Sequence, residues 1–506
     1  MPEHLRALVV ILAIAAMTLL VARPAFAGAM DRDDFSRRWG VWVSLTLVAF
    51  LAHNQWIYLA VSMVVLYVAQ RREHNVVALF FVALFALPPF RLEVPGFGIV
   101  NFLIDLNHAR LLSLVLLLPA WLRLRAQSRT LPFGRNLPDK LLLAFAVLTV
   151  VLELRATSVT DTLRQGFYVC TDVFLPYYVT SRALRDLRTM REAMAGFVIA
   201  AMILGGVALV EYLKGWLLYS SLPAALGVAR EMGGYLPRGT SLRALASTGQ
   251  PIVLGYVMVV ALGFFLFVKG SVTRVTHHRM ILAFLLVGLL ASLSRGPWVG
   301  AVVLMLAFLS LGTRPLQSLV KFFAVGALVI LAAITLPGGA KVIDLLPFVG
   351  TVDSANVTYR ERLLDNALIV IERNPLLGSV DYLESTEMQA MLQGQGIIDV
   401  VNSYLGVALE YGLAGLGLFV AFFLVIVLSV HRKLRSLAHE HHGERVLGAV
   451  LLSTLIGILV MIYTVSSIVA IPIVYWAVAG LGVAYARTTA SRHEPVNARQ
   501  YLGAET

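Results

Sequence analysis

Long apolar runs are the feature of the sequence that most limits how the chain can fold. Segments that could cross a bilayer as helices, roughly 17–25 residues each, recur along all 506 residues. Hydrophobic residues make up 59% of the chain and charged residues 14%, whereas soluble domains carry about 45–50% and about 25%. A soluble fold could not bury this apolar surplus, and a disordered chain would lack it. The sequence therefore predicts an all-α polytopic membrane protein of about 12–14 transmembrane helices.

Basic residues gather in alternate connections between these runs. The basic connections are Arg71-Arg72, 123–140, 182–191, 269–279, 314–321, 432–445 and the tail from 487. The positive-inside rule places them in the cytoplasm, and on that layout both termini are cytoplasmic and the number of spans is even. The net charge of +12 then largely reflects topology, so we expect no nucleic-acid partner.

Two places allow more than one interpretation. Residues 1–28 contain an apolar run followed by Ala25-Phe26-Ala27, a pattern typical of a cleavable signal peptide. We favour an uncleaved anchor, because polytopic proteins seldom need a cleaved signal. The apolar run at 41–69 is interrupted by His53-Asn54-Gln55, where two short helices would fit. We prefer one long span with a polar middle, because it keeps the even number of spans.

We expect residues 1–506 to form a single membrane domain with two large outside loops. The loops cover 213–248 and 337–404, and loops of that length commonly carry binding or catalytic residues. The single cysteine, Cys170, excludes an intrachain disulfide and a cysteine metal cluster.

Arginines in the outside connections are the main candidate functional residues. They are Arg238, Arg243, Arg360, Arg362 and, in a short turn between two spans, Arg295. An arginine held on this side opposes the positive-inside bias, and an anionic partner offsets the cost. Because guanidinium groups bind phosphate bidentately, we expect a site for a phosphorylated or pyrophosphorylated ligand. The simpler interpretation is that each arginine reaches lipid phosphates.

The second loop carries helical signals of its own. Thr358-x-x-Glu361 is a capping-box pattern, and apolar residues follow at helical spacing as far as Asn374-Pro375. This pattern predicts an amphipathic helix on the membrane surface, with a second short helix near 384–392. Arg360 and Arg362 would fall in the first turn, where the helix dipole disfavours cations, which again favours a ligand-binding role.

Several motifs follow one another across these segments. They are Arg238-x10-Gly249, Arg243 before Gly249-Gln250-Pro251, Ser294-Arg295-Gly296, Arg362-x15-Gly378, Asn402-x-Tyr404-Leu405 and Glu410-x-Gly412-x-x-Gly415. Their order resembles that of the O-antigen ligase and Wzy-type polysaccharide polymerase superfamily, over about residues 235–430.

The resemblance implies a GT-C-like, inverting membrane glycosyltransferase that needs no metal ion or cofactor. Its donor would be an undecaprenyl-pyrophosphate-linked oligosaccharide, and its acceptor a sugar hydroxyl of a second lipid-linked repeat unit. The ligase branch carries a histidine just before the Asn-x-Tyr-Leu segment, where this chain has Val401. A polymerase for exopolysaccharide or O-antigen is therefore favoured over a ligase that uses the lipid A core. A flippase or secondary transporter is the alternative outside enzymes, although no inverted repeat is visible.

The resemblance also implies a place and a set of residue roles. The protein would lie in the bacterial inner membrane with its active site facing the periplasm, among membrane lipids and other polysaccharide assembly and export proteins. The catalytic residues would be Arg243, Arg295 and Arg362, which stabilise the leaving pyrophosphate, and Glu410 as general base. The substrate-binding residues would be Arg238, Arg360, Asn402, Tyr404, Gly249 and Gly378. Glu410 could instead pair structurally with an arginine, and Tyr404 could serve as an interfacial anchor.

Overall fold

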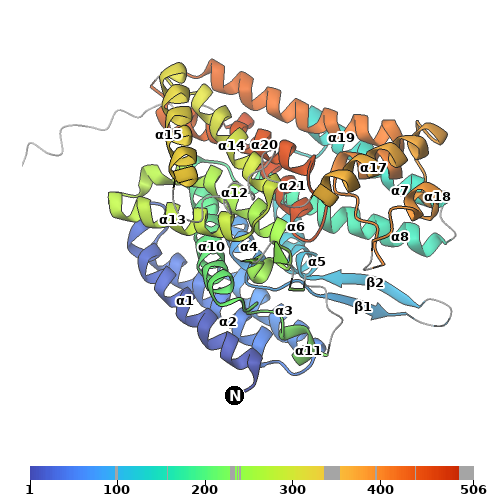
Figure 1. The fold of residues 1–506 in the computed structure, drawn as a ribbon, viewed down its shortest axis with the longest axis horizontal. Helices are drawn as coiled ribbons and strands as arrows, with labels where there is room; N and C mark the ends of the chain where they lie inside the picture. The colour runs from blue at the N-terminus through green and yellow to red at the C-terminus, as the bar shows by residue number, and fades with distance from the viewer. Residues whose placement is uncertain are drawn as a thin grey trace, which may run out of the picture.

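Helices make up most of the chain in the computed structural model (Figure 1). The structure describes residues 1–96, 98, 101–155, 158–227, 234–235, 237–238, 241–335, 354–393, 396–438 and 440–488. Within these ranges, six helices are long and apolar enough to cross a membrane: α1 (Glu3–Ala25), α10 (Leu187–Lys214), α12 (Pro251–Val268), α15 (Pro315–Thr335), α19 (Ser403–Ser436) and α20 (His442–Ile462). The expected all-α polytopic membrane fold is thereby confirmed, while the figure of 12–14 spans stays a prediction.

Shorter helices complete the bundle. The longer ones are α2 (Arg32–Leu51), α3 (Gln55–Arg71), α7 (Leu137–Leu152), α13 (Val275–Ala291), α14 (Arg295–Ser310), α17 (Ser354–Arg373) and α21 (Ile471–Arg487). The shortest are α4 (Val76–Leu84), α5 (His108–Leu112), α6 (Leu118–Ala126), α8 (Val159–Tyr168), α9 (Leu175–Ala183), α11 (Leu222–Leu226) and α18 (Thr386–Gln389). Short π-helical segments, Ser113–Leu117 and Val169–Phe174, join α5 to α6 and α8 to α9.

Two small antiparallel hairpins interrupt the helices. The first pairs β1 (Arg91–Pro95) with β2 (Phe102–Asn107), placing Glu93 opposite Asp105. The second pairs β3 (Pro237–Arg238) with β4 (Ser241–Leu242). The β1–β2 hairpin, α17 and α18 gather at one side of the bundle (Figure 1).

The core is built around α10 and α12, which are buried over most of their length. Between the charged residues near the ends of α10, both are apolar on all faces, as expected for helices surrounded by other helices. Small residues allow the closest approach: a Cβ on Gly205 of α10 would lie 2.2 Å from the Phe284 carbonyl oxygen of α13. Close packing at glycines is a usual way for membrane helices to associate.

The single long span expected at 41–69 is wrong, because the chain turns back at its polar middle. Asn54 caps α3 by accepting a hydrogen bond from the Trp56 amide at 2.7 Å. The two helices form a hairpin, since Arg38 near the start of α2 pairs with Glu73 just after α3 at 2.6 Å. The polar residues therefore end one helix and begin the next instead of lying inside the membrane.

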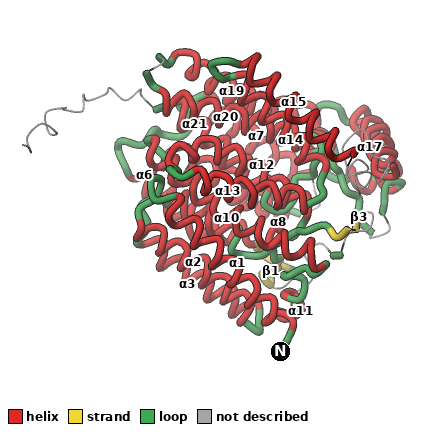
Figure 2. The backbone as a smooth tube through the Cα atoms, turned by 60° about the vertical axis from the view of Figure 1, so that its left-hand side comes forward, coloured by secondary structure: helices red, strands yellow, loops and turns green. Residues whose placement is uncertain are grey.

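Contacts between the segments that connect the helices show that these segments lie at two opposite ends of the bundle. Asp31 pairs with Arg188, Arg185 donates to Gln127, and Lys433 donates to Thr488. We call this the basic end (residues 26–38, 71–75, 127–136, 182–191, 269–274, 432–438 and 487–488). The opposite, loop end comprises residues 91–95, 102–107, 215–222, 241–250, 292–295, 374–393 and 463–470. Figure 2 shows α17 and β3 on the side of the bundle away from α6.

The first helix runs from the loop end to the basic end. The Trp216 indole donates to the Glu3 carboxylate at 2.9 Å, while Phe26, after the helix, is buried. The last helix, α21, ends at the basic end, beside Lys433. The start of α1 and the end of α21 thus lie at opposite ends of the bundle, against the expectation that both termini share one side.

This topology can be checked by cysteine labelling in a Cys170→Ala background. In cells with a permeabilised outer membrane, a membrane-impermeant thiol reagent should label Pro2→Cys but not Arg72→Cys, because these exposed positions lie at opposite ends. Labelling of both, or of Arg72→Cys alone, would contradict the arrangement.

Candidate functional site

A turn at the loop end brings Arg243 beside Arg295. The Arg243 guanidinium donates to the Ser294 hydroxyl at 3.0 Å and to the Ser292 carbonyl at 3.4 Å. Ser294 is the residue before α14, and Arg295 is its first residue. Two expected catalytic arginines thus lie at the N-terminus of one helix, where the helix dipole also favours an anion.

The backbone of this turn is held in a strained conformation. Leu293 has φ of 46° and Ala246, three residues after Arg243, has φ of 47°. Non-glycine residues seldom occupy this left-handed region, and such strain is typical of functional sites. Both residues are buried, so the surrounding packing maintains the conformation.

Glu211 holds the segment that carries Arg243. Its fully buried carboxylate accepts hydrogen bonds from the backbone amides of Leu218, Leu245 and Ala246, at 3.0, 2.9 and 2.8 Å. Sequence analysis did not select Glu211, although a carboxylate near the end of an apolar helix was a usable signal. It positions the arginine segment through the backbone.

Arg360 and Arg362 flank the buried stripe of α17 on opposite sides. Tyr359, Leu363 and Ala367 pack inward, and successive helical residues are about 100° apart. Arg360 donates to the Thr464 carbonyl at 3.1 Å, and Arg362 is exposed.

Thr464 links α17 to the turn of α14. A Cβ on Gly296 would lie 2.4 Å from the Thr464 hydroxyl oxygen, so the two segments touch. The structure therefore connects Arg243, Arg295 and Arg360 through Ser294, Gly296 and Thr464. Arg362 makes no ion pair with the residues that the structure describes. No sequence pattern marked Thr464.

A break in α19 forms a second part of the loop end. Gly412 has φ of 67° and ψ of −170°, which interrupts the helix. The segment after α17 docks there: the Leu413 and Ala414 amides donate to the Pro375 and Leu376 carbonyls at 2.8 and 3.1 Å. In the other direction, the Ser379 amide donates to the Leu409 carbonyl at 2.9 Å. Backbone groups freed by the break are thus satisfied by the docked segment.

Gly378 and Gly412 permit this close approach. A Cβ on Gly378 would lie 2.5 Å from the Leu409 carbonyl oxygen, and a Cβ on Gly412 would lie 2.4 Å from the Leu376 carbonyl carbon. Both have positive φ, which glycine alone adopts freely. The structure thus places Gly378, an expected substrate-binding residue, in backbone packing at the break.

Arg155 also binds the segment that docks on the break in α19. Its guanidinium donates to the Gly378 carbonyl at 2.8 Å and the Leu377 carbonyl at 3.1 Å. It lies in the short helical turn Glu153–Arg155 after α7. Arg155 was not predicted from the sequence, because the position of a lone arginine after an apolar run is also explained by membrane topology alone.

Glu410 lies at the break, in a mostly buried aromatic environment. Burial, together with the nearby Glu410 carboxylate, raises the pKa of Tyr382 to about 12. Tyr411, beside Glu410, accepts a hydrogen bond from the Gln165 amide at 3.1 Å. Among described residues Glu410 has no arginine ion pair, so the structural pairing considered from sequence is not seen there.

The remaining expected residues have clear local roles. Asn402 caps α19 by accepting hydrogen bonds from the Tyr404 and Leu405 amides, and the Tyr404 hydroxyl donates to the Leu459 carbonyl at 2.9 Å. Gly249, with φ of 78°, packs against Pro89. Arg238 lies opposite Ser241 in the register of the β3–β4 hairpin.

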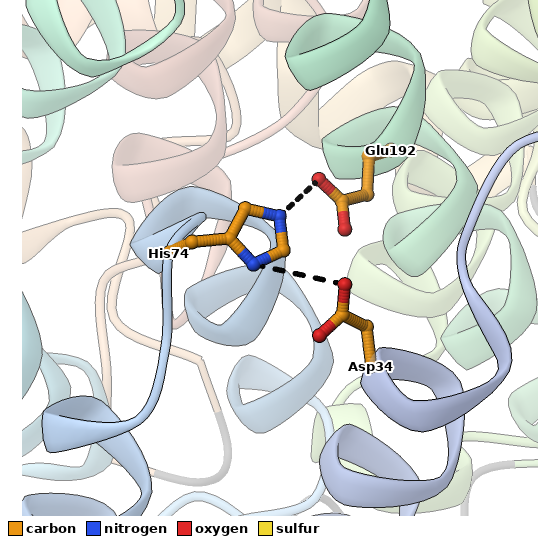
Figure 3. A group of neighbouring side chains, drawn as sticks. All are labelled: Asp34, His74 and Glu192. Carbon is orange, nitrogen blue, oxygen red and sulfur yellow. Dashed lines mark hydrogen bonds and ion pairs between the residues drawn. The ribbon is translucent and has the colours of Figure 1, made fainter.

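At the opposite, basic end, Asp34, His74 and Glu192 are close enough to suggest a metal site (Figure 3). His74 already bridges the two carboxylates, at 3.1 Å to Glu192 and 3.6 Å to Asp34. The fully buried Arg38 pairs with Glu192 at 2.8 Å, so a cation would meet a guanidinium there. These residues fit an ion-pair network better than a metal centre.

Arg38 also affects the pKa of the neighbouring Glu73. Burial disfavours the charged carboxylate, but the hydrogen bond and charge of Arg38 outweigh it and hold the pKa of Glu73 below its ordinary value.

Part of the chain matches a known protein family. Residues 280–420 match the family model described as O-antigen ligase. This confirms the resemblance to the O-antigen ligase and Wzy-type superfamily, a group of membrane glycosyltransferase-like enzymes. The match includes Arg295, Arg362, Gly378 and Glu410, and it leaves out Arg238, Arg243 and Gly249. No curated protein matches the chain at a significant level.

Because residues 375–379 dock on the break in α19, the loss of stability on replacing a glycine in this helix should depend strongly on its position. Gly412→Ala should lower the free energy of unfolding by at least about 1–3 kcal/mol, the usual cost of strained backbone, with steric clash in addition. Gly417→Ala, where a Cβ has open space, should leave it unchanged or slightly raised. Thermal unfolding in detergent compares the two, and equal effects would contradict the docking.

Loss of the Glu211 carboxylate should misplace the Arg243 segment. Glu211→Gln keeps the size but has one acceptor oxygen in place of two, so buried amide hydrogens lose partners, at about 1–3 kcal/mol each. We expect lower thermal stability in detergent and reduced activity in membranes. Glu372→Gln, an exposed change on α17, is the control. Wild-type values for Glu211→Gln would contradict the positioning role.

Proposed function

We propose that this protein polymerises undecaprenyl-pyrophosphate-linked oligosaccharide repeat units at the periplasmic face of the bacterial inner membrane. The reaction would be an inverting glycosyl transfer without a metal ion or cofactor. The product would be an exopolysaccharide or O-antigen chain.

The observation that carries this proposal is the connection of Arg243, Arg295 and Arg360 around the N-terminus of α14. Arg243 donates to Ser294, Arg360 donates to Thr464, and Thr464 touches Gly296. Guanidinium groups beside a helix N-terminus suit a pyrophosphate whose charge grows as it leaves. The structure favours Arg360 above Arg362 for this role, although Arg362 remains in the proposed catalytic set, and Arg238 in the substrate-binding set.

In the proposed reaction, the acceptor hydroxyl oxygen bonds to the anomeric carbon of the donor sugar. The bond from that carbon to the pyrophosphate oxygen breaks, and its electron pair leaves with undecaprenyl pyrophosphate. The hydroxyl proton passes to Glu410 as general base. Ser403, which donates to the Val465 carbonyl beside Thr464, is two helical turns, about 10 Å, before Glu410, so α19 connects the proposed base to the segment that Arg360 contacts.

An apolar groove supports a lipid-linked substrate. It has a volume of about 330 Å³ and lies between α7 and the segment from α8 to the following π-helix, with Val147, Val150, Gly166 and Val169 among its lining residues. Gln165, beside this groove, contacts Tyr411 next to Glu410. A prenyl chain in the groove would thus lie beside the proposed site.

An O-antigen ligase is the second candidate, favoured by the description of the matching family model. Val401 in place of a histidine favours the polymerase. Cells that lack the protein distinguish the candidates: loss of a polymerase leaves single lipid-linked units on the outer leaflet, loss of a ligase leaves long chains off lipid A, and loss of a flippase leaves units inside.

Substitution of the arginines tests the site. Arg243→Ala, Arg295→Ala and Arg362→Ala should each lower chain growth about 100-fold or more, the usual effect of losing a charge-stabilising donor. Arg243→Lys should also fail if bidentate contact matters. Arg373→Ala is the matched control, since Arg373 pairs outside the site with Glu387 at 2.9 Å. Normal polymer from any two of the three alanine variants, with protein still in the membrane, would contradict the assignment.

The direct experiment uses purified protein with lipid-linked repeat units and a chelator. A ladder of products in the chelator's presence is expected, because arginines are proposed to neutralise the leaving group. A reaction that needs an added divalent ion would contradict the proposed mechanism.

A further inference from the structure

A polar cavity of about 180 Å³ lies at the basic end, far from the proposed active site. It opens between the α6–α7 connection, the end of α9 and the end of α21. Its polar lining includes Arg129, Thr130, Ser181, Arg182, Arg185 and Arg487. A buried water needs about 10–15 Å³, so the cavity can hold a group the size of a hydrated phosphate.

Positive charge dominates the cavity. Arg182 is buried and pairs with the fully buried Asp139, which also accepts a hydrogen bond from Tyr177. Within the described part of the chain, Asp139 is the one carboxylate that forms an ion pair with the four arginines of the cavity. Three further guanidinium groups, those of Arg129, Arg185 and Arg487, line the same cavity and form no ion pair of their own among the residues that the structure describes.

The hydrogen-bond partners of Arg185 are neutral. Arg185 donates to the Gln127 amide oxygen at 2.7 Å and to the Thr130 hydroxyl at 3.0 Å. These bonds aim the guanidinium but do not offset its charge. Arg487 feels the like charges of Arg182 and Arg185 together with the opposite charge of Asp139, so several guanidinium groups share one carboxylate.

We propose that this cavity binds the phosphate of an anionic ligand at the membrane surface. Like charges held together are costly without an anion, and arginine forks match phosphate oxygens. The cavity lies where spans end, and basic pockets between helices at that depth bind anionic lipid headgroups. The phosphate belongs either to such a headgroup or to a free phosphate. Occupancy would tie α9 to α21 and the α6–α7 connection.

The test measures thermal stability of the purified full-length protein in detergent. Phosphatidylglycerol, phosphatidylcholine and inorganic phosphate are titrated separately into wild type and variants. We expect a saturable rise in Tm with phosphatidylglycerol and none with phosphatidylcholine. In Arg185→Gln/Arg487→Gln, the half-saturating concentration should rise at least about tenfold, the usual effect of losing charge-assisted hydrogen bonds.

A matched variant controls for general charge. Arg432→Gln/Arg435→Gln removes two exposed arginines of the basic end outside the cavity and should change half-saturation less than about twofold. Equal weakening in both double variants, or no saturable effect of any phosphate compound, would overturn the proposal. If inorganic phosphate alone raises Tm with the same dependence on Arg185 and Arg487, the ligand is free phosphate; if it does not, the ligand is a headgroup.

A conservative variant guards against misfolding of the double variant. Arg487→Lys keeps the charge but loses the fork, so it should weaken binding measurably while Arg432→Lys does not. Identical half-saturation in these two variants would overturn a site built on bidentate contact.

Discussion

The backbone hydrogen bonds between residues 375–379 and the break in α19 are the constraint on which the loop end depends. A bilayer offers no water to backbone groups, so a helix can break at membrane depth only where protein satisfies them. The docked segment does so for Leu409, Leu413 and Ala414. Beyond the break, residues 413–436 alone extend about 36 Å, enough to span, so the first turns of α19 can belong to the site.

This docking also gives a packing reason for the fixed distance between Arg362 and Gly378 in this chain. Arg362 lies on α17 and Gly378 on the docked segment, so one spacing connects the surface helix to the break. Gly412 is the matching position on α19. The fixed spacing thus reflects how α17 and the docked segment pack against α19. The chemistry proposed for the arginines depends on this packing, because the packing holds α17 in place.

Charged groups inside the bundle are stabilised in two different ways. At the basic end, arginine and carboxylate pair directly, as in Arg38 with Glu73 and Arg182 with Asp139. At the loop end, Glu211 is surrounded instead by backbone amides. Direct pairing brings opposite side-chain charges together, whereas Glu211 holds the segment that carries Arg243 through its backbone.

Several local features follow from the sequence because they need only neighbouring residues. The amphipathic helix expected after Thr358 is found as part of α17, which ends before Asn374-Pro375, and Ser385 caps α18 within the second expected helix. The hairpin at Asn54 could not be chosen in the same way. Hydropathy is equal for one long span and for two short helices, and the Asn54 cap and the Arg38–Glu73 contact distinguish them only in the folded structure.

The sequence by itself determined the membrane class, the alternation of basic connections and the order of the motifs, because these depend on composition and local spacing. The tertiary structure alone decided which residues meet. It placed the N-terminus at the loop end, joined Arg360 rather than Arg362 to the α14 turn through Thr464, and brought Glu211 and Arg155 into the site. Each of these contacts joins segments far apart in the chain, and periodicity carries no information about such distances.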